Sequence, residues 1–388
     1  MILEDVDFAD SYENDVKSPD YFRNKIMRIT TDIGTFETPD RMNTRSEYLA
    51  RSGMGLLKVL PRELAIDFKL LDQEHVEHLM NDDKKAAKMV ALTKQFNDIT
   101  RRAVFRLSIF QPSVAALDDM DIKRKIEFAD TQARSLQIAL GTNLITFPYL
   151  KLPLSDYINF IDTHYRRDEE FSTIFTLDLG MDPSYLEKIL HHLAAKEEPI
   201  IIPVIYKHPD HSIPQRRIIA SYFNNKRIAF LACQVPRENF DIHASNLHQV
   251  AFREGFDLVA LLQPAPSHPD EDEERDLNKI KIFDPSTLGI DSIHNVLAIP
   301  SRNIIDELKL PSYDLQDLSY LNRALRGYRG ALNSDRKFQY LYYLARSHEG
   351  ITSPPMFGIA RERIEKGEMA EYIRGTKLST IPMIDRRF

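Results

Sequence analysis

The sequence predicts an α/β protein built on a (β/α)8 TIM-type barrel, with an N-terminal β-hairpin extension and a helical C-terminal extension. Residues 134–150, RSLQIALGTNLITFPYL, predict a helix that ends at Gly141 and an apolar strand that follows at once. The strand is too apolar to have one face exposed to solvent, and it is typical of a parallel sheet that helices cover on both sides. Counting a run at 56–60, seven such repeats occur, at a spacing of about 25 to 35 residues from Val104 on. This alternation favours the barrel.

A doubly wound parallel sheet is the alternative architecture. Such a sheet is expected to begin with a glycine-rich turn of the form G-x-G-x-x-G, and the sequence contains none. The barrel needs one more strand than the repeats supply. We expect that strand within residues 60–100.

The segments before the repeats are short. Residues 1–25 are strongly acidic and lack a signal-peptide pattern, so we expect a mobile or loosely docked extension. Residues 27–38, MRITTDIGTFET, place a turn sequence between two β-rich runs and predict a hairpin. Residues 55–60, GLLKVL, are expected to be the first barrel strand, and residues 71–97 a charged helical segment.

The barrel is expected over residues 26–300. Asp182 and Pro183 predict an N-cap and first helical turn, because Asp accepts from free backbone N–H groups and Pro lacks an N–H that is not needed there. One face of that helix is expected to carry Leu186, Ile189, Leu190 and Leu193. Other helices are expected at 122–140, at 155–166, from Pro214, and through Leu247, Val250 and Ala251. Strands are expected at 104–110, 143–150, 172–178, 199–206, 227–234 and 256–263.

The pattern changes after residue 263. Residues 264–276, PAPSHPDEDEERD, predict an exposed loop whose acidic run is a solvated insert rather than a metal site. Residues 279–283 predict a short strand. Residues 301–388 are expected to form a helical region rich in aromatic and basic side chains.

Composition excludes several classes of protein. The net charge of -7 gives no global basic field of the kind that marks a nucleic-acid binder. The single cysteine, Cys233, excludes a disulfide framework and a Cys-rich zinc site, fits a reducing cytoplasm, and is expected to be buried in a strand. No apolar stretch approaches the ~20 residues that a membrane span needs. We therefore expect a cytoplasmic protein with no metal and no cofactor.

Sequence motifs for several reactions are missing. The chain has no G-x-x-x-x-G-K-[ST], no G-x-S-x-G and no H-E-x-x-H, which argues against P-loop, esterase and zincin chemistry. Three histidine pairs have spacings that would allow both side chains to bind one metal ion, but none has a third ligand at a suitable spacing. We interpret them as solvated side chains: His75 and His78, His191 and His192, and His208 and His211.

Polar residues at the carboxyl ends of the expected strands are the first candidates for a site, because barrel active sites lie there. Asp178 ends the strand STIFTLD and is a candidate base, nucleophile or ligand; the alternative is that it caps the next helix or has another structural role. His208 lies at another strand end. The candidates for substrate binding are Gln111, Gln234, Arg237 and Gln263.

The C-terminal region has two interpretations. Its basic and aromatic side chains are candidates for holding a phosphate backbone and stacking bases. Alternatively, the region is a helical pair packed on the barrel with its arginines outside. The candidate nucleic-acid-binding residues are Arg323, Arg326, Arg329 and Lys337.

Five short motifs, in order along residues 28–285, resemble those of the tRNA-guanine transglycosylase family. Residues 136–145, LQIALGTNLI, are similar to the family's I-Q-x-x-L-G-A-D-I turn, and residues 34–39, GTFETP, to its G-x-I-E-T-P hairpin. Residues 109–111, IFQ, resemble the end of D-S-G-G-F-Q, and residues 277–281, LNKIK, resemble L-N-I-K. The span 227–263, with Gly255 and Asp257, resembles the family region that begins with R-Y-L-M-G-V-G and ends with G-x-D-x-F-D-C-V-L-P.

The resemblance implies a (β/α)8 barrel that exchanges a guanine in tRNA or DNA for a 7-deazaguanine base, with one Asp as nucleophile and a second as base. The chain has Arg106, Pro148 and Ala260 where the family motifs place Asp, and Cys233 alone cannot build the family's zinc cluster. The carboxylates open to these roles are Asp178, Asp257 and Asp284.

Three functions remain open on the sequence. The first is base exchange on tRNA or DNA, with the branch of the family that modifies DNA as one candidate. The second is a catalytically inactive barrel that binds nucleic acid or pairs with an active subunit, as a homo- or hetero-oligomer. The third is an unrelated barrel enzyme for a small metabolite.

Overall fold

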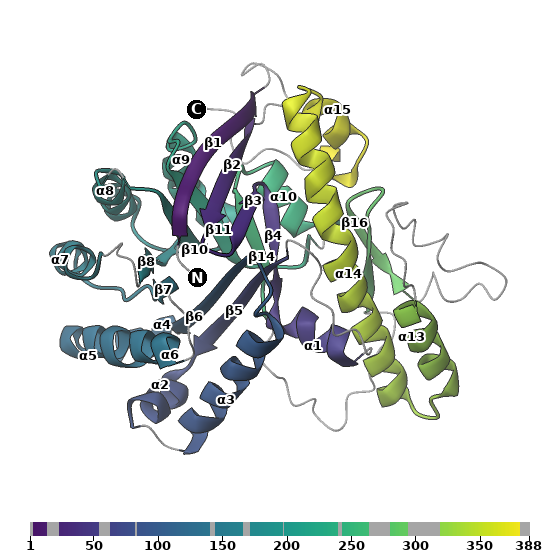
Figure 1. Cartoon of the computed structure of the whole chain (residues 1–388), viewed down its shortest axis with the longest axis horizontal. Coiled ribbons are helices and arrows are strands. Elements are labelled where there is room, and N and C mark those ends of the chain that lie inside the picture. The colour runs from purple at the N-terminus through teal and green to yellow at the C-terminus, as the bar shows by residue number, and fades with distance from the viewer. Residues whose placement is uncertain are drawn as a thin grey trace.

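The computed structural model is an α/β fold, described here for residues 3–13, 23–53, 63–81, 84–139, 144–165, 171–196, 198–239, 243–263, 280–293 and 319–380. Figure 1 shows the strands gathered at the centre, several helices on one side of them and the long helix α14 (Ser334–Glu365) on the other. None of the helices within these residues combines the length and the apolar character needed to cross a membrane.

A curled, open sheet of seven parallel strands forms the centre of the fold. Its order is β6-β5-β4-β14-β11-β10-β9, so a strand from late in the chain, β14, pairs with β4 from near the beginning. The strands are β4 (Asp40–Thr44), β5 (Leu64–Leu71), β6 (Phe105–Pro112), β9 (Leu177–Asp178), β10 (Ile200–Ile205), β11 (Ile228–Val235) and β14 (Leu258–Leu261). This confirms the predicted α/β class and parallel sheet.

Two further parallel strands, β7 (Leu144–Phe147) and β8 (Ser172–Phe175), form a separate pair. After Thr176, β8 continues into β9 of the large sheet. Within the described residues no backbone ladder joins β6 to β7, so the sheet is a half-barrel and the predicted closed ring of eight strands is not shown.

Two glutamine side chains bond the free edge of β7. The Gln137 amide donates to Thr146 O at 2.9 Å and accepts from Thr146 N at 2.8 Å. The Gln111 amide, at the end of β6, does the same for Tyr149, with both bonds at 2.9 Å. Because buried backbone groups must be paired, these amides take the place of missing ladder bonds between β6 and β7.

Helices follow most of the parallel strands. The N-cap prediction is confirmed: Asp182 accepts from the backbone N–H groups of Ser184 and Tyr185 at the start of α8 (Pro183–Ala194), and the predicted apolar face of that helix is buried. The helix expected at 122–140 is interrupted by a π-helical segment, Phe128–Arg134, between α5 (Ile122–Glu127) and α6 (Ser135–Ala139). The remaining helices of this part are α1 (Arg45–Gly53), α2 (Gln73–Met80), α3 (Lys84–Ile99), α4 (Val114–Asp118), α7 (Leu154–His164), α9 (Ile213–Ser221) and α10 (Asn246–Phe252).

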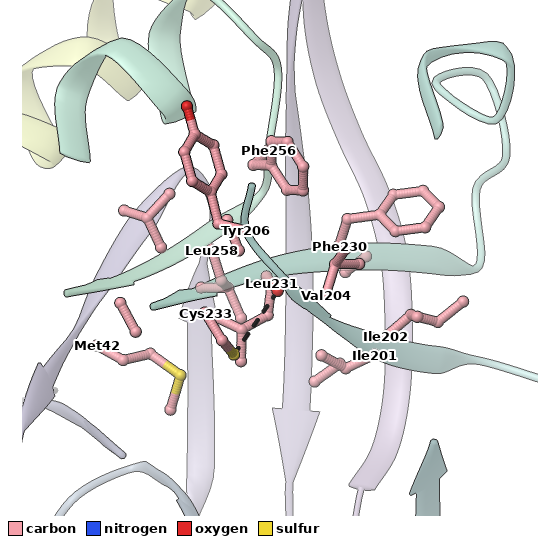
Figure 2. Close-up of a cluster of buried hydrophobic side chains, with 14 of the residues drawn as sticks. Met42, Ile201, Ile202, Val204, Tyr206, Phe230, Leu231, Cys233, Phe256 and Leu258 are labelled. Carbon is pink, nitrogen blue, oxygen red and sulfur yellow. Dashed lines mark hydrogen bonds between the residues drawn. The ribbon is translucent and has the colours of Figure 1, made fainter. Parts of the chain in front are cut away.

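Apolar side chains from several strands form the main core. Figure 2 shows Met42, Cys233 and Leu258, which come from β4, β11 and β14 and belong to one buried cluster. Cys233 is fully buried, and its thiol lies 3.9 Å from Leu231 O, which confirms the prediction of a buried small side chain. Burial raises the pKa of this thiol far above its ordinary value, so it is not a reactive thiolate.

An antiparallel N-terminal sheet covers the amino ends of the parallel strands. It consists of β1 (Leu3–Glu13), β2 (Arg23–Thr31) and β3 (Gly34–Glu37), and the predicted hairpin is the β2–β3 pair. Lys25 donates to Ile228 O at the start of β11, and Thr31 donates to Val104 O just before β6. The expectation of a loosely docked extension was wrong for β1, because this strand pairs along β2, buries Leu3 and Val6 in the core and packs Phe8 and Tyr12 against it.

The first two central strands differ from the sequence prediction. Residues 55–60, expected as the first barrel strand, lie outside the described residues. The strand expected within 60–100 is β5, and β4 was not predicted. A small antiparallel sheet adds β12 (Glu238–Asn239), β13 (Ala244–Ser245), β16 (Gly289–Ser292) and β15 (Lys281–Asp284), the last of which matches the short strand predicted at 279–283.

The C-terminal region packs α14 against β4, α1 and β15, with α13 (Ser319–Gly330) and α15 (Met369–Arg374) beside it. Pro354 lacks the N–H that would bond Gly350 O within α14, and Arg51 Nη2 donates to that carbonyl at 2.7 Å instead. Only a glycine fits there easily, since a Cβ on Gly350 would lie 3.1 Å from the same Arg51 nitrogen. Arg41 Nη1 donates to the neighbouring Glu349 O.

Asp40, at the start of β4, should make stability depend on pH. Burial raises the pKa of its carboxyl to about 6, although Arg361, at 3.4 Å, acts to lower it. The folded state therefore binds the proton more tightly than the unfolded chain, and the free energy of unfolding should fall as the pH rises from about 4 to 6.

Asp40→Asn should remove this part of the pH dependence. Between pH 4 and pH 6 the wild type should lose about 2 kcal/mol more than the variant, as measured by urea unfolding at both pH values. Equal losses in the two proteins would contradict the raised pKa.

Candidate binding site at the carboxyl ends of the strands

Four of the predicted site residues lie at the same edge of the sheet, because the carboxyl ends of parallel strands meet there. Gln111 lies in β6, Asp178 ends β9, Gln234 lies near the end of β11, and Gln263 follows β14. Arg237 lies in the segment after β11. These residues thus lie at the edge of the sheet that the sequence predicted for them.

Asp178 and Lys207 form the charged pair of this edge. Asp178 pairs in register with Ile205 of β10, so Lys207, two residues further on, points to the same side of the sheet. Its Nζ lies 3.4 Å from Asp178 Oδ2. The Asp178 side chain is only 6% exposed whereas that of Lys207 is 37% exposed, so the ammonium is the part that solvent reaches.

Gly180 fixes the orientation of the Asp178 carboxylate. Its backbone N–H donates to Asp178 Oδ1 at 2.6 Å. A Cβ at this position would lie 3.0 Å from that oxygen and 3.4 Å from Lys207 Cε, so any larger residue would displace the pair. The alternative interpretation of Asp178 as a helix cap does not hold, because Asp182 caps α8.

Tyr149 lies close to this pair. Burial raises the pKa of its phenol to about 12, and the negative charges of Asp178 and Asp118 act in the same direction. Asp118, at the end of α4, is itself paired with Lys151 at 2.5 Å. Tyr149 is therefore a neutral hydrogen-bonding group near two carboxylates, and its pKa is too high for it to act as a base at neutral pH.

The sequence prediction missed Lys207, Tyr149 and Asp118. Lys207 follows directly after the predicted strand 199–206, so its place at a strand end was visible. Its pairing with Asp178 depends on the β9–β10 register, which the sequence does not give. Asp118 comes from a short helix that was not predicted, and no spacing in the sequence relates it to Tyr149.

Two predicted substrate-binding glutamines have structural partners. The Gln111 amide is buried and engaged on both sides by the backbone of Tyr149. The Gln263 amide donates to Ile66 O of β5 at 3.2 Å. The first contact joins β6 to the segment after β7, and the second joins the segment after β14 to β5, so we do not assign either side chain to a ligand.

Asp257 lies at the opposite end of the sheet from Asp178. It precedes β14, accepts from Phe230 N at 2.8 Å, and lies 3.7 Å from Lys25 Nζ beneath the N-terminal sheet. Burial raises the pKa of its carboxyl, against the opposing effect of Lys25. We therefore withdraw Asp257 as a catalytic candidate, because its partners and position are those of a structural side chain.

Asp284 lies outside the central parallel sheet. It ends β15 in the small antiparallel sheet, and its carboxylate accepts from Ser286 N, Ser286 Oγ and Thr287 Oγ1 at 2.7–2.9 Å. These bonds shape a turn. The three predicted catalytic carboxylates, Asp178, Asp257 and Asp284, are thus not brought together.

The basic side chains of the C-terminal region lie on a helical pair, α13 and α14. Arg326 and Arg329 are exposed, and Lys337 Nζ lies 5.9 Å from the centre of the Tyr328 ring. Arg323 belongs to α13, but its side chain lies outside the described residues. The nearby aromatic rings are used in helix packing: Tyr340 covers Gly327, and Tyr343 covers Gly53 of α1.

The remaining histidine and acidic candidates form no metal site in the described part of the chain. His75 and His78 contact Asp72 and Glu74 on the partly exposed surface of α2. The acidic run 264–276 lies outside the described residues. No family model and no curated protein matches this chain, so its function has to be argued from the geometry.

Proposed function

We propose that this protein binds a guanine-type base, either guanine or a 7-deazaguanine, at Asp178 and Lys207. The observation that carries the proposal is the pairing of a buried carboxylate with a solvent-facing ammonium at the strand ends. The Watson–Crick edge of guanine has two N–H donors beside one carbonyl acceptor. A carboxylate next to an ammonium offers the complementary groups, and enzymes that read an extruded base use this edge.

The two side chains have unused hydrogen-bonding capacity for such contacts. Asp178 Oδ1 accepts one bond from Gly180 N, and each carboxylate oxygen can accept a second. Lys207 Nζ has three N–H groups, of which one faces Asp178. A 7-deazaguanine has the same Watson–Crick edge as guanine, so this site accepts both bases equally well.

The proposed architecture is the transglycosylase-like (β/α)8 barrel, with the β7–β8 pair completing the ring. Three observations support it: β14 pairs with β4, β8 continues into β9, and the Gln111 and Gln137 amides bond the free edge of β7. Asp178 and Lys207 then lie at the end of the barrel where such enzymes bind substrate.

Base selectivity tests this function. Guanine and 7-deazaguanine should bind with equal affinity, and hypoxanthine, which lacks the amino group, about 10-fold more weakly because it loses a hydrogen bond to a charged acceptor. Adenine should not compete, since its N1 lone pair would face the carboxylate. Isothermal titration with the four bases measures this order. Equal binding of adenine and guanine would contradict the proposal.

Base exchange in tRNA or DNA is the second candidate, because the charges of Asp178 and Asp118 both act on Tyr149 at one edge. Exchange needs a carboxylate that bonds ribose C1′ as guanine leaves and is displaced by the incoming base, and a second group that moves the proton. Incorporation of labelled guanine into tRNA and duplex DNA should then be lost in Asp178→Ala and kept in Asp257→Ala. Incorporation that survives Asp178→Ala would contradict a catalytic Asp178.

If wild-type protein exchanges no base on either substrate, the remaining proposal is a catalytically inactive barrel that binds nucleic acid or an active partner. The exposed Arg326 and Arg329 on α13 support contact with a phosphate backbone. Together with the base contacts proposed at Asp178 and Lys207, these arginines make the proposed ligand a guanine or 7-deazaguanine base within tRNA or DNA.

A further inference from the structure

Two buried hydrogen-bond donors near the end of β11 have no partner among the described residues. They are Nε2 of Gln234 and Nη2 of Arg237. Gln234 has a φ of 62°, a left-handed conformation that non-glycine residues rarely adopt. It lies where the β11–β14 register shifts, between Ala232 and Val235. Strained backbone of this kind is retained where the surroundings impose it, often at ligand sites.

Arg237 lies among other charged side chains. Its Nε donates to Glu349 of α14, which is fully buried. Burial acts to raise the pKa of Glu349, but the guanidiniums of Arg237, Arg41 and Arg346 together hold that pKa below its ordinary value. Arg41 is also paired with Glu47. With Glu238, which follows Arg237 in the chain, the region holds three guanidiniums and three carboxylates, and all three guanidiniums act on Glu349.

Two acceptors in the same region also lack partners among the described residues. They are Oε2 of Glu238 and Oε1 of Glu349. A ligand that bonds to both the free donors and the free acceptors of the protein must itself carry acceptors and donors. A phosphate supplies acceptors and sugar hydroxyls supply donors, so a pentose phosphate fits this set better than a bare anion.

The place of these residues in the fold points to the same class of ligand. Counted from β4, the strands β11 and β14 hold the seventh and eighth places of the proposed barrel, and barrels commonly bind phosphate in the segments after these strands. β11 is two strands away from β9, which ends in Asp178. At about 4.8 Å per strand the two positions are about 10 Å apart, a separation that one nucleotide can span.

We propose that Gln234 and Arg237 form a subsite for the pentose phosphate of a nucleotide, with its guanine-type base at Asp178 and Lys207. The choice of base rests on the proposed function, whereas the phosphate subsite stands on its own residues. The Gln234 amide and the free arm of Arg237 donate to the phosphate. Glu238 accepts from the sugar hydroxyls.

The test compares guanosine, guanosine 5′-phosphate and ribose 5-phosphate by isothermal titration on the full chain. Wild-type protein should bind guanosine 5′-phosphate about 10-fold or more tighter than guanosine, as expected for charge-assisted hydrogen bonds, and should bind ribose 5-phosphate alone. Gln234→Gly removes the amide at a position whose backbone suits glycine, so the variant should fold normally. Arg237→Lys keeps the positive charge beside Glu349 and removes the second donor arm.

Both variants should reduce the advantage of guanosine 5′-phosphate to less than about threefold and leave the affinity for guanosine unchanged. Arg217→Lys, on α9, is the matched control and should change neither. Binding of ribose 5-phosphate without guanosine would support the subsite and refute the base site. Guanosine binding with no gain from phosphate would overturn the subsite, as would a gain that survives in both variants.

Discussion

Glu47→Ala should lower the free energy of unfolding by about 3 to 5 kcal/mol, the largest stability loss that we expect from one substitution in this chain. Glu47 and Arg41 form an ion pair whose two side chains are completely buried. Glu47 also accepts from Thr44 N at 2.7 Å and from Thr44 Oγ1 at 3.0 Å. Its removal leaves a buried guanidinium without a carboxylate, and desolvation of that charge is the cost.

Two comparisons isolate this effect in urea unfolding. Glu37→Ala breaks an exposed pair, with Arg28 56% and Glu37 36% exposed, and should cost less than about 1 kcal/mol. The double variant Arg41→Met/Glu47→Leu removes both buried charges and should recover most of the loss, because apolar residues can replace a buried ion pair. A loss below about 1 kcal/mol in Glu47→Ala would contradict the buried pair.

Asp178→Asn should weaken binding of guanine about 30-fold or more, the largest effect on ligand binding that we expect. The substitution replaces one carboxylate oxygen by an NH2 group, which would face an N–H donor of the base. It also removes the charge that holds Lys207 at 3.4 Å. The loss of a charge-assisted hydrogen bond and the new clash of donors together account for this magnitude.

Asp182→Asn is the matched control for that substitution. Asp182 lies four positions further on and caps α8, a role that Asn fills as well as Asp does. Guanine affinity should therefore stay at the wild-type value, as should the melting temperature. If Asp178→Asn binds guanine as tightly as Asp182→Asn does, the ligand does not use this carboxylate.

Between residues 104 and 263 the sequence predicted most of the fold. Strands buried on both faces are nearly continuous apolar runs, and β10, with the sequence IIIPVI and every residue buried, shows why they are easy to recognise. Asp182 and Pro183 gave the start of α8 because capping is a local interaction. In these segments local preference and tertiary packing agree.

The elements that the sequence missed owe their structure to distant partners. β4 reads DRMNT, which has no apolar run, and its polar side chains are buried because α1 and α14 supply partners for them. β1 is acidic, and its pairing with β2 and the burial of Leu3 and Val6 help to hold it in place. Such contacts join residues far apart in the chain, which local patterns cannot reveal.

The candidate site was predicted in part for the same reason. Asp178 could be found because it ends an apolar strand. Asp257 was a candidate only through the resemblance to a family motif, and it precedes β14, which starts at Leu258, at the amino end of that strand. The role of Lys207 requires the register between two strands that are far apart in the sequence.

The central claim is that Asp178 and Lys207 read the Watson–Crick edge of a guanine-type base. A crystal structure of the protein soaked with guanine tests it most directly. We predict the base N1 and N2 atoms at about 2.7 to 3.2 Å from the Asp178 carboxylate, and its O6 atom at a similar distance from Lys207 Nζ. Guanine bound elsewhere on the protein, or bound at this edge with its Watson–Crick atoms turned away from Asp178, would contradict the claim.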